Sequence, residues 1–368
     1  MNQSTASKPR RRTHGAPAKP ARATRQATRS KDGTIRVDLA LQGGGAHGAF
    51  TWGVLDRLLE EKWLAFDGIS GTSAGAMNAV VMADGLTEGG PDRARESLEA
   101  FWKRVSDAAL MSPLRRGPLE ILAGSWTLDY SPVFAAMDIA ARVLSPYDTN
   151  PMGTNPLRKI LADSVCFERL TSAPIKLFVT ATNVRTGRGH IFRNADLTPD
   201  VLLASACLPT MFQAVEIDGD PYWDGGYAGN PSMGPLIREC TASDTILVQI
   251  NPIERPGTPR TAREIHNRLN EIAFNSVLLK ELHAGAMLRQ VADPGTGEGA
   301  VWARMRVHRI ASDVMLDLDS SSKMIAEWPF LCMLRDEGRR ATEAFLAAHT
   351  SDLGVRSTLE LDTLDENG

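Results

Sequence analysis

The sequence predicts an α/β fold built on a central parallel sheet. Two glycine-rich turns within residues 35–81 carry this prediction: residues 43–48 (GGGAHG) and 71–75 (GTSAG). Each turn follows a short apolar run and precedes a helical pattern. Strand, glycine turn and helix, repeated twice, form a βαβα unit whose two turns open at the same edge of a parallel sheet. A length of 368 residues with 43% hydrophobic content is enough to bury a large core.

The elements of the first third follow from apolar spacing. Residues 35–41 are almost continuously apolar, which is typical of a strand buried on both faces. Residues 49–62 place Trp52, Leu55 and Leu58 at helical spacing. A second short strand is expected at 66–70 and a helix of small residues at 76–83. Residues 91–150 are aromatic-rich and interrupted by three Ser-Pro pairs, which predicts a helical insertion that either lines a substrate pocket or forms an ordinary helical layer.

The remaining chain continues the alternation of strands and helices. A hairpin is expected around the Asp-Gly-Asp turn at 218–220. Helices are expected at 156–164, 200–207, 262–291 and 323–349, and strands at 175–182, 189–193, 213–217, 221–223, 245–250 and 301–310. We therefore expect one domain over residues 31–349, followed by a frayed acidic end at 350–368.

Charge is distributed unevenly along the chain. Residues 1–34 hold nine Lys or Arg against one Asp, although the whole chain has a net charge of -3. Residues 1–30 contain almost no large apolar side chains, so we expect a disordered basic tail that is either solvating or attracted to anionic lipid. Nucleic acid is not an expected partner. The residues leave oligomeric state open.

Composition excludes several classes of protein. The longest apolar runs fall well short of about 20 residues, so no membrane-spanning helix is expected. The N-terminus lacks the apolar run of a secretion signal. The cysteines, Cys166, Cys207, Cys240 and Cys332, form no C-x-x-C pair, which argues against a metal site or a disulfide scaffold. We expect a cytoplasmic protein that can associate peripherally with a membrane.

Ser73 stands at the centre of a G-x-S-x-G pattern. A serine on a sharp strand-to-helix turn has strained backbone and an exposed hydroxyl, and neighbouring elements leave room only for glycine at the flanking positions, Gly71 and Gly75. The N-terminus of the following helix favours negative charge that develops nearby. The pattern predicts a nucleophilic serine.

The earlier turn, Gly43–Gly48, can be interpreted in two ways. As G-x-G-x-x-G it matches a dinucleotide fingerprint, with Asp67 about 20 residues further on. As a glycine loop with free N–H groups it is an oxyanion hole. An acidic residue that holds a ribose should end the second strand, whereas Asp67 lies near its start. We therefore favour the oxyanion hole.

A nucleophilic serine needs a base. The downstream histidines His266, His283 and His308 fall in predicted helices or a strand, where side chains are usually structural. Asp224 instead follows a short strand and precedes Gly225 and Gly226, which permit close backbone approach. A carboxylate held against a serine hydroxyl can accept its proton.

The motifs GGGAHG, GTSAG and DGG, in this order and at this spacing, resemble the patatin-like phospholipase family. The resemblance spans about residues 37–252, and supporting stretches lie at 178–183 (FVTATN), 204–212 (ASACLPTMF) and Asn230-Pro231. Stretches at 264–282 and 328–340 are similar to a bacterial branch of the family.

The resemblance implies a three-layer α/β/α sandwich with a mostly parallel sheet and hydrolysis of lipid acyl esters without a cofactor or metal. It assigns Ser73 as nucleophile, Asp224 as base, and Gly43, Gly44 and Gly45 as oxyanion hole, with Gly48 completing the first motif. Many members carry Arg or Lys where this chain has His47, which we expect to be a surface residue. The alternative is a nucleotide- or lipid-binding module whose glycine turns do not support hydrolysis.

Overall fold

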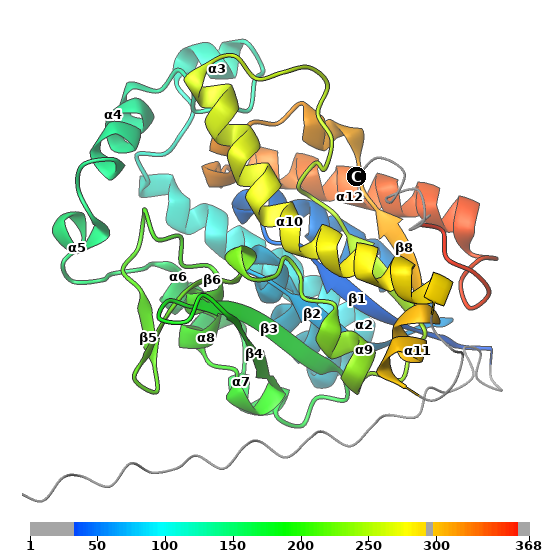
Figure 1. Ribbon diagram of the computed structural model, residues 1–368. Coiled ribbons are helices and arrows are strands. Elements are labelled where there is room, and N and C mark those ends of the chain that lie inside the picture. Colours follow the sequence, from blue (N-terminus) through cyan, green and yellow to red (C-terminus); the bar gives the residue numbers. More distant parts are fainter. Residues whose placement is uncertain (1–32, 292–296, 360–368) are drawn as a thin grey trace, which may run out of the picture.

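The computed structural model describes residues 33–291 and 297–359 and centres on a mixed eight-stranded sheet (Figure 1). The strand order is β5-β6-β3-β2-β1-β7-β8, with β4 pairing β3 outside this path. β3, β2, β1, β7 and β8 run parallel, and β4, β5 and β6 join antiparallel. The strands are β1 Ile35–Leu41, β2 Leu64–Gly71, β3 Lys176–Asn183, β4 Gly189–Arg193, β5 Val215–Ile217, β6 Asp220–Asp224, β7 Asp244–Val248 and β8 Arg306–Ile310.

Helices cover both faces of the sheet (Figure 1). The α-helices are α1 Gly48–Leu58, α2 Ala74–Ala108, α3 Pro118–Leu122, α4 Pro132–Ala141, α5 Pro146–Thr149, α6 Leu157–Ser164, α7 Phe167–Leu170, α8 Pro199–Ser205, α9 Gly234–Glu239, α10 Ala262–Val291, α11 Glu298–Ala303 and α12 Trp328–His349. Short 3-10 helices lie at η1 Gly45–His47, η2 Ala109–Met111, η3 Asn194–Asp196, η4 Gly225–Tyr227, η5 Asp313–Leu316 and η6 Ser320–Met324. The predicted three-layer α/β/α architecture is confirmed.

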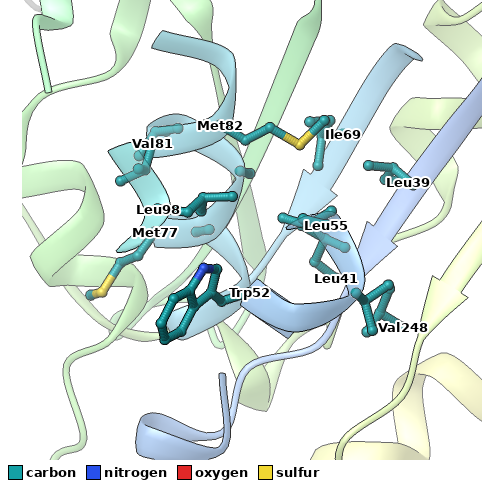
Figure 2. Close-up of a cluster of buried hydrophobic side chains, with 14 of the residues drawn as sticks. Leu39, Leu41, Trp52, Leu55, Ile69, Met77, Val81, Met82, Leu98 and Val248 are labelled. Carbon is teal, nitrogen blue, oxygen red and sulfur yellow. The ribbon is translucent and has the colours of Figure 1, made fainter. Parts of the chain in front are cut away.

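Two apolar layers fill the space between the sheet and these helices. Leu39 and Leu41 of β1 face α1 and α2, whose side chains surround them in Figure 2, whereas Ala40 packs with the opposite layer, formed by α9, α10 and α11. Alternate residues of β1 point to opposite layers, so both faces of the strand are buried. This explains why the sequence of β1 is almost continuously apolar. The core thus fixes the strand ends from which the glycine turns emerge.

Three segments are assigned differently from the sequence prediction, and the other predicted boundaries differ by four residues or fewer. Residues 91–108 continue α2 beyond a kink at Gly89 and Gly90, and their apolar side chains lie in the core, so the separate segment begins only at 109. Residues 301–303 belong to α11 because the alternating strand pattern starts only at Arg306. Lys323 belongs to η6, and the last helix begins at Trp328.

The predicted fraying after residue 350 is wrong for residues 350–359. The N–H groups of Thr358 and Leu359 donate to the carbonyl of Val307 at 3.1 and 3.0 Å, and Leu353 is buried. This stretch therefore lies along β8. The basic tail at 1–30 and the acidic end at 360–368 lie outside the described residues. Within the residues described, no helix has the length and apolarity to cross a membrane.

Helices α1 and α12 approach each other closely through two glycines. A Cβ on Gly53 would lie 1.9 Å from the Arg335 carbonyl oxygen, and one on Gly338 would lie 2.1 Å from the Phe50 carbonyl oxygen. Both obstacles are backbone atoms, which cannot rotate away as a flexible side chain can. The contact places α12 firmly over α1, directly behind the first glycine turn.

Gly53→Ala should therefore destabilise the protein by about 1–3 kcal/mol, the usual cost of overpacking a core. Urea denaturation measures the change in the free energy of unfolding. Gly285→Ala in α10 is the matched control, because its Cβ would meet Trp302 at an ordinary 3.6 Å and alanine favours a helix. Equal urea midpoints for Gly53→Ala and wild type would contradict the close approach of α1 and α12.

Candidate active site

Ser73 occupies the sharp turn between β2 and α2. Its backbone has φ 52° and ψ −123°, a left-handed conformation that serine rarely adopts. A Cβ on Gly71 would lie 2.7 Å from the Ala76 nitrogen, and one on Gly75 would lie 2.3 Å from the Leu41 oxygen. Both flanking positions therefore require glycine, as the G-x-S-x-G pattern predicted.

Hydrogen bonds from a third element hold this strained turn. The Ser73 N–H donates to Ser205 Oγ at 2.9 Å, and that hydroxyl donates to the Thr180 carbonyl at 2.7 Å. Ser205 lies in α8 and Thr180 in β3, so the turn is anchored to the sheet beside it. Strain of this kind persists only where surrounding structure fixes the backbone.

Strand β3 brings Asp224 to the same place. Gly71 at the end of β2 pairs with Val179, and two residues further along β3, Ala181 pairs with Asp224 at the end of β6. β6 therefore pairs with the part of β3 that lies beyond the end of β2. The Asp224 carboxylate is buried and interacts with the Ser73 hydroxyl. This interaction lowers the pKa of Asp224 and so opposes the effect of burial.

The surroundings of Asp224 set its charge. Burial raises the pKa of this carboxyl to about 7, and the Gly226 N–H, the Ser73 hydroxyl and the Lys323 charge oppose that rise only in part. The Gly226 N–H donates to Asp224 Oδ1 at 2.7 Å. A Cβ on Gly225 would lie 2.0 Å from the Thr180 oxygen, which explains the need for glycine directly after the aspartate.

The first glycine turn lies against Ser73. A Cβ on Gly43 would come within 2.8 Å of the Ser73 Cβ, and one on Gly48 would lie 2.6 Å from the Ala74 Cβ. The Gly43 N–H donates to Asn230 Oδ1 at 2.6 Å, so this donor is already occupied. Among the residues that the structure describes, no acceptor pairs with the N–H of Gly44 or Gly45.

Buried amide side chains hold the glycine turn from behind. Gln42 Oε1 accepts from the N–H groups of Ile250 and Asn251, and its Nε2 donates to Asn275 Oδ1 at 3.0 Å. Asn251 Nδ2 donates to the Gly43 carbonyl at 2.8 Å. The sequence analysis missed this network, because isolated Asn and Gln residues far apart in the chain form no motif.

Lys323 supplies a cation that the sequence analysis also missed. Its Nζ donates to Asn251 Oδ1 at 2.7 Å, and its carbonyl oxygen would lie 2.4 Å from a Cβ on Gly45. Burial lowers the pKa of this lysine to about 8, with a further lowering from Arg255 and an opposing effect from Glu271 and Asp224. The lysine thus lies beside the glycine turn and within electrostatic range of Asp224.

His47 is buried rather than at the surface, contrary to prediction. Its Nε2 lies 2.7 Å from Ser322 Oγ, and its Nδ1 has no hydrogen-bond partner among the described residues. Burial lowers the pKa of this imidazole well below its ordinary value, and Lys323 and Arg255 lower it further. A neutral His47 therefore supplies no positive charge to the first glycine turn.

Two other residues that the sequence offered for the site, His308 and Asp67, have structural partners. His308 Nε2 is 3.1 Å from Asp244 Oδ1 and its Nδ1 is 3.1 Å from Thr358 Oγ1, so this buried histidine ties β8 to β7 and to the C-terminal stretch. Asp67 Oδ2 accepts from the Thr241 hydroxyl at 2.7 Å and from the Ala242 N–H at 3.2 Å. Asp67 is thus a structural residue, which removes the acidic partner of a dinucleotide site.

One cluster bears on the expectation of no metal. Asp38, Asp67 and Cys240 are buried with potential ligand atoms within 4.8 Å of one another. The Gly68 N–H donates to Asp38 Oδ1 at 3.0 Å, and Asp67 is engaged as described above. Asp67 is compensated by Thr241, Ala242 and the cations of Arg36 and Lys176, and the expectation that the chain holds no metal stays a prediction.

Comparison with known proteins identifies the family. The model of the patatin-like phospholipase family matches residues 39–237, more than half of the chain. The chain belongs to the patatin-like phospholipase family. No curated protein matches. Among solved structures, the crystal structure of VipD from Legionella pneumophila is similar at 14% identity with a TM-score of 0.39, covering 89% of this chain and 71% of that one.

Membership of the patatin-like phospholipase family indicates lipid acyl hydrolase activity and a lipid substrate, and it confirms the predicted resemblance. Ser73 and Asp224 both lie inside the matched residues. Asn251, Asn275 and Lys323 lie beyond its end, so part of the polar surround of the glycine turn comes from outside the family match.

The raised pKa of Asp224 predicts that the free energy of unfolding depends on pH. Well below pH 3.8 the carboxyl holds its proton in both the folded and the unfolded state. As pH rises from 3.8 to about 7, the unfolded state loses this proton first, so the free energy of unfolding falls. Asp224→Asn removes the buried charge, so it should raise the free energy of unfolding by roughly 1–4 kcal/mol at pH 8. Thermal unfolding at pH 4 and pH 8 measures this.

The exposed Asp218, in the same hairpin, gives the matched control Asp218→Asn, which should change stability little at either pH. A stability gain for Asp224→Asn that is the same at pH 4 and pH 8 would contradict a buried carboxylate as its cause.

Proposed function

We propose that this chain is a serine lipid acyl hydrolase that cleaves fatty-acyl esters of phospholipids or related lipids through a Ser73–Asp224 dyad. The observation that supports this most directly is a strained, glycine-flanked serine whose hydroxyl interacts with a buried carboxylate of pKa about 7. A base whose pKa lies near the working pH combines a large unprotonated fraction with useful proton affinity.

The first half-reaction forms an acyl-enzyme. Ser73 Oγ attacks the ester carbonyl while Asp224 takes its proton, and the carbonyl oxygen becomes an oxyanion. Collapse of this tetrahedral species breaks the bond to the leaving alcohol, which receives the proton from Asp224. The acyl group remains on Ser73 as an ester.

The N–H groups of Gly44 and Gly45 stabilise the oxyanion in this proposal. The N–H of Gly43 is bound to Asn230, so Gly43 shapes the turn rather than donating to substrate. Lys323, held beside the turn by Asn251, adds positive charge where negative charge develops. A donor of this kind is worth roughly 10²–10³ in rate.

The second half-reaction releases the fatty acid. Asp224 takes a proton from water, the hydroxide attacks the acyl carbonyl, and Ser73 leaves as its alcohol after recovering the proton. The dyad chemistry itself requires neither a metal nor a cofactor. The basic N-terminal tail is a candidate for contact with anionic lipid, and association of the protein with a membrane surface would be peripheral.

Ser73→Ala and Asp224→Asn should each lower kcat/KM for p-nitrophenyl esters and phospholipids by about 10³-fold or more, because the two groups act as a unit. Initial-rate assays measure this, and a fluorophosphonate probe should label wild type but not Ser73→Ala. Asp218→Asn, also followed by glycine, is the matched control and should retain full activity. Near wild-type turnover in either dyad variant would rule out the mechanism.

The two shifted pKa values predict a bell-shaped pH profile. Activity should rise with pH through about 7, as Asp224 loses its proton and becomes a base, and fall above about 8, as Lys323 loses its charge. Lys323→Met should lower kcat/KM by roughly tenfold to a hundredfold and remove the alkaline decline. A kcat/KM profile for soluble ester measures both limbs. An alkaline limb that survives in Lys323→Met would exclude the lysine as its source.

A further inference from the structure

Exposed apolar side chains gather in one segment, residues 109–154, which we name the cap. Thirteen of the nineteen large apolar side chains that are exposed among the described residues lie in it. Met111, Leu122 and Met152 are 92%, 87% and 86% exposed. Helix α4 is almost entirely apolar, with Asp138 as its one charged side chain, and yet none of its residues is buried. Soluble monomers rarely expose so large an apolar surface unless it contacts something.

The start of α10 extends this surface. Ile265, Leu269 and Ile272 recur at helical spacing and are exposed. Arg263 of the same helix donates to the Asp129 carbonyl at 3.0 Å and forms an ion pair with the Asp129 carboxylate at 3.0 Å. Figure 1 shows α3 next to the beginning of α10, with α4 and α5 along the same outer edge. The cap and the start of α10 therefore belong to one face of the molecule.

The cap is anchored on both sides of the dyad. Near its middle, the Leu128 N–H donates to Ser321 Oγ at 3.2 Å, two residues before Lys323. Near its end, the Asn150 carbonyl accepts from Gln213 Nε2 at 2.7 Å. The Gln213 carbonyl in turn accepts from Cys207 Sγ, and the Cys207 carbonyl accepts from the Asp224 N–H at 2.8 Å.

We propose that the cap and the start of α10 dock on the surface of aggregated lipid and deliver acyl chains to Ser73. This proposal rests on the proposed function, because it identifies the physical state of the substrate as a bilayer or micelle. An apolar face whose two anchors flank the dyad lets a lipid chain leave the aggregate next to the nucleophile. The half-exposed Tyr227, two residues after Gly225, packs on Phe274 of α10.

The charge of the cap indicates that it binds lipid through apolar contact, whatever the headgroup, and not through electrostatic attraction. The cap contains three arginines and four carboxylates in 46 residues, so it offers no excess of positive charge. Binding by the cap should therefore occur on neutral phosphatidylcholine vesicles and survive high salt, because apolar burial and not counter-ion attraction drives it. Attraction through the basic N-terminal residues would show the opposite dependence.

The test uses the full chain with Leu119→Glu and Leu122→Glu combined in α3. Met287→Glu and Val355→Glu are the matched controls, because these side chains are 52% and 72% exposed and lie outside the cap. Sedimentation with phosphatidylcholine vesicles in high salt measures binding. Hydrolysis of vesicle lipid and of soluble p-nitrophenyl butyrate measures the two activities.

The cap variant should lose vesicle binding and vesicle hydrolysis by tenfold or more, because charges replace two exposed leucines that the proposal places in the lipid, and it should keep its rate on the soluble ester. The controls should match wild type in all three assays. Unchanged vesicle binding in the cap variant would overturn the proposal. So would size-exclusion chromatography in which wild type is a dimer, the cap variant a monomer, and both bind vesicles equally.

The two proposals fail separately. If wild type hydrolyses neither vesicle lipid nor soluble ester, the proposed function fails, while sedimentation still decides whether the cap binds lipid. If wild type hydrolyses both and the cap variant does so equally well, only the docking surface is wrong.

Discussion

The register of one strand governs the candidate site. β2 pairs with the first part of β3 and β6 pairs with the last part. The end of β2, which leads into the turn at Ser73, and the end of β6 at Asp224 therefore meet within three residues of β3, Val179–Ala181. Thr180 lies between the two pairings and accepts from Ser205, which in turn accepts from the Ser73 N–H. A slip of one residue in either pairing would reverse the face on which the dyad lies.

This constraint explains why sequence patterns singled out Ser73 and Asp224, which the structure brings together, but not the side chains around them. Ser73, Gly71 and Gly75 are close in the chain and fit one turn geometry, so local sterics suffice to predict them. Asp224 was predicted from the glycines after it, and Thr180 shows why: its carbonyl leaves no space for a Cβ at Gly225. The boundary of α2 was misplaced because Pro91 interrupts the pattern, whereas burial of Leu98 and Phe101 keeps the later part in the core.

The residues that sequence reasoning missed share a physical cause. Gln42, Asn251 and Lys323 act through contacts that span more than 70 residues of chain, and no periodicity or spacing encodes such contacts. His47 was expected at the surface because a histidine at a helix N-terminus usually is exposed. Packing of η6 against the glycine turn buries it, and this depends on the Ser322 hydroxyl that only the tertiary structure places there.

The same packing joins the cation, the glycine turn and the cap. Ser321, Ser322 and Lys323 are consecutive residues of η6, and they contact the Leu128 N–H, the His47 imidazole and the Asn251 amide respectively. A shift of η6 would therefore move the positive charge relative to Gly44 and Gly45 and at the same time alter an anchor of the cap. The first glycine motif carries a neutral histidine, and the charge beside Gly44 and Gly45 comes from a segment that also anchors the cap. Under the two proposals above, lipid contact and transition-state stabilisation would be coupled through these three adjacent side chains, without any change in the strained turn at Ser73.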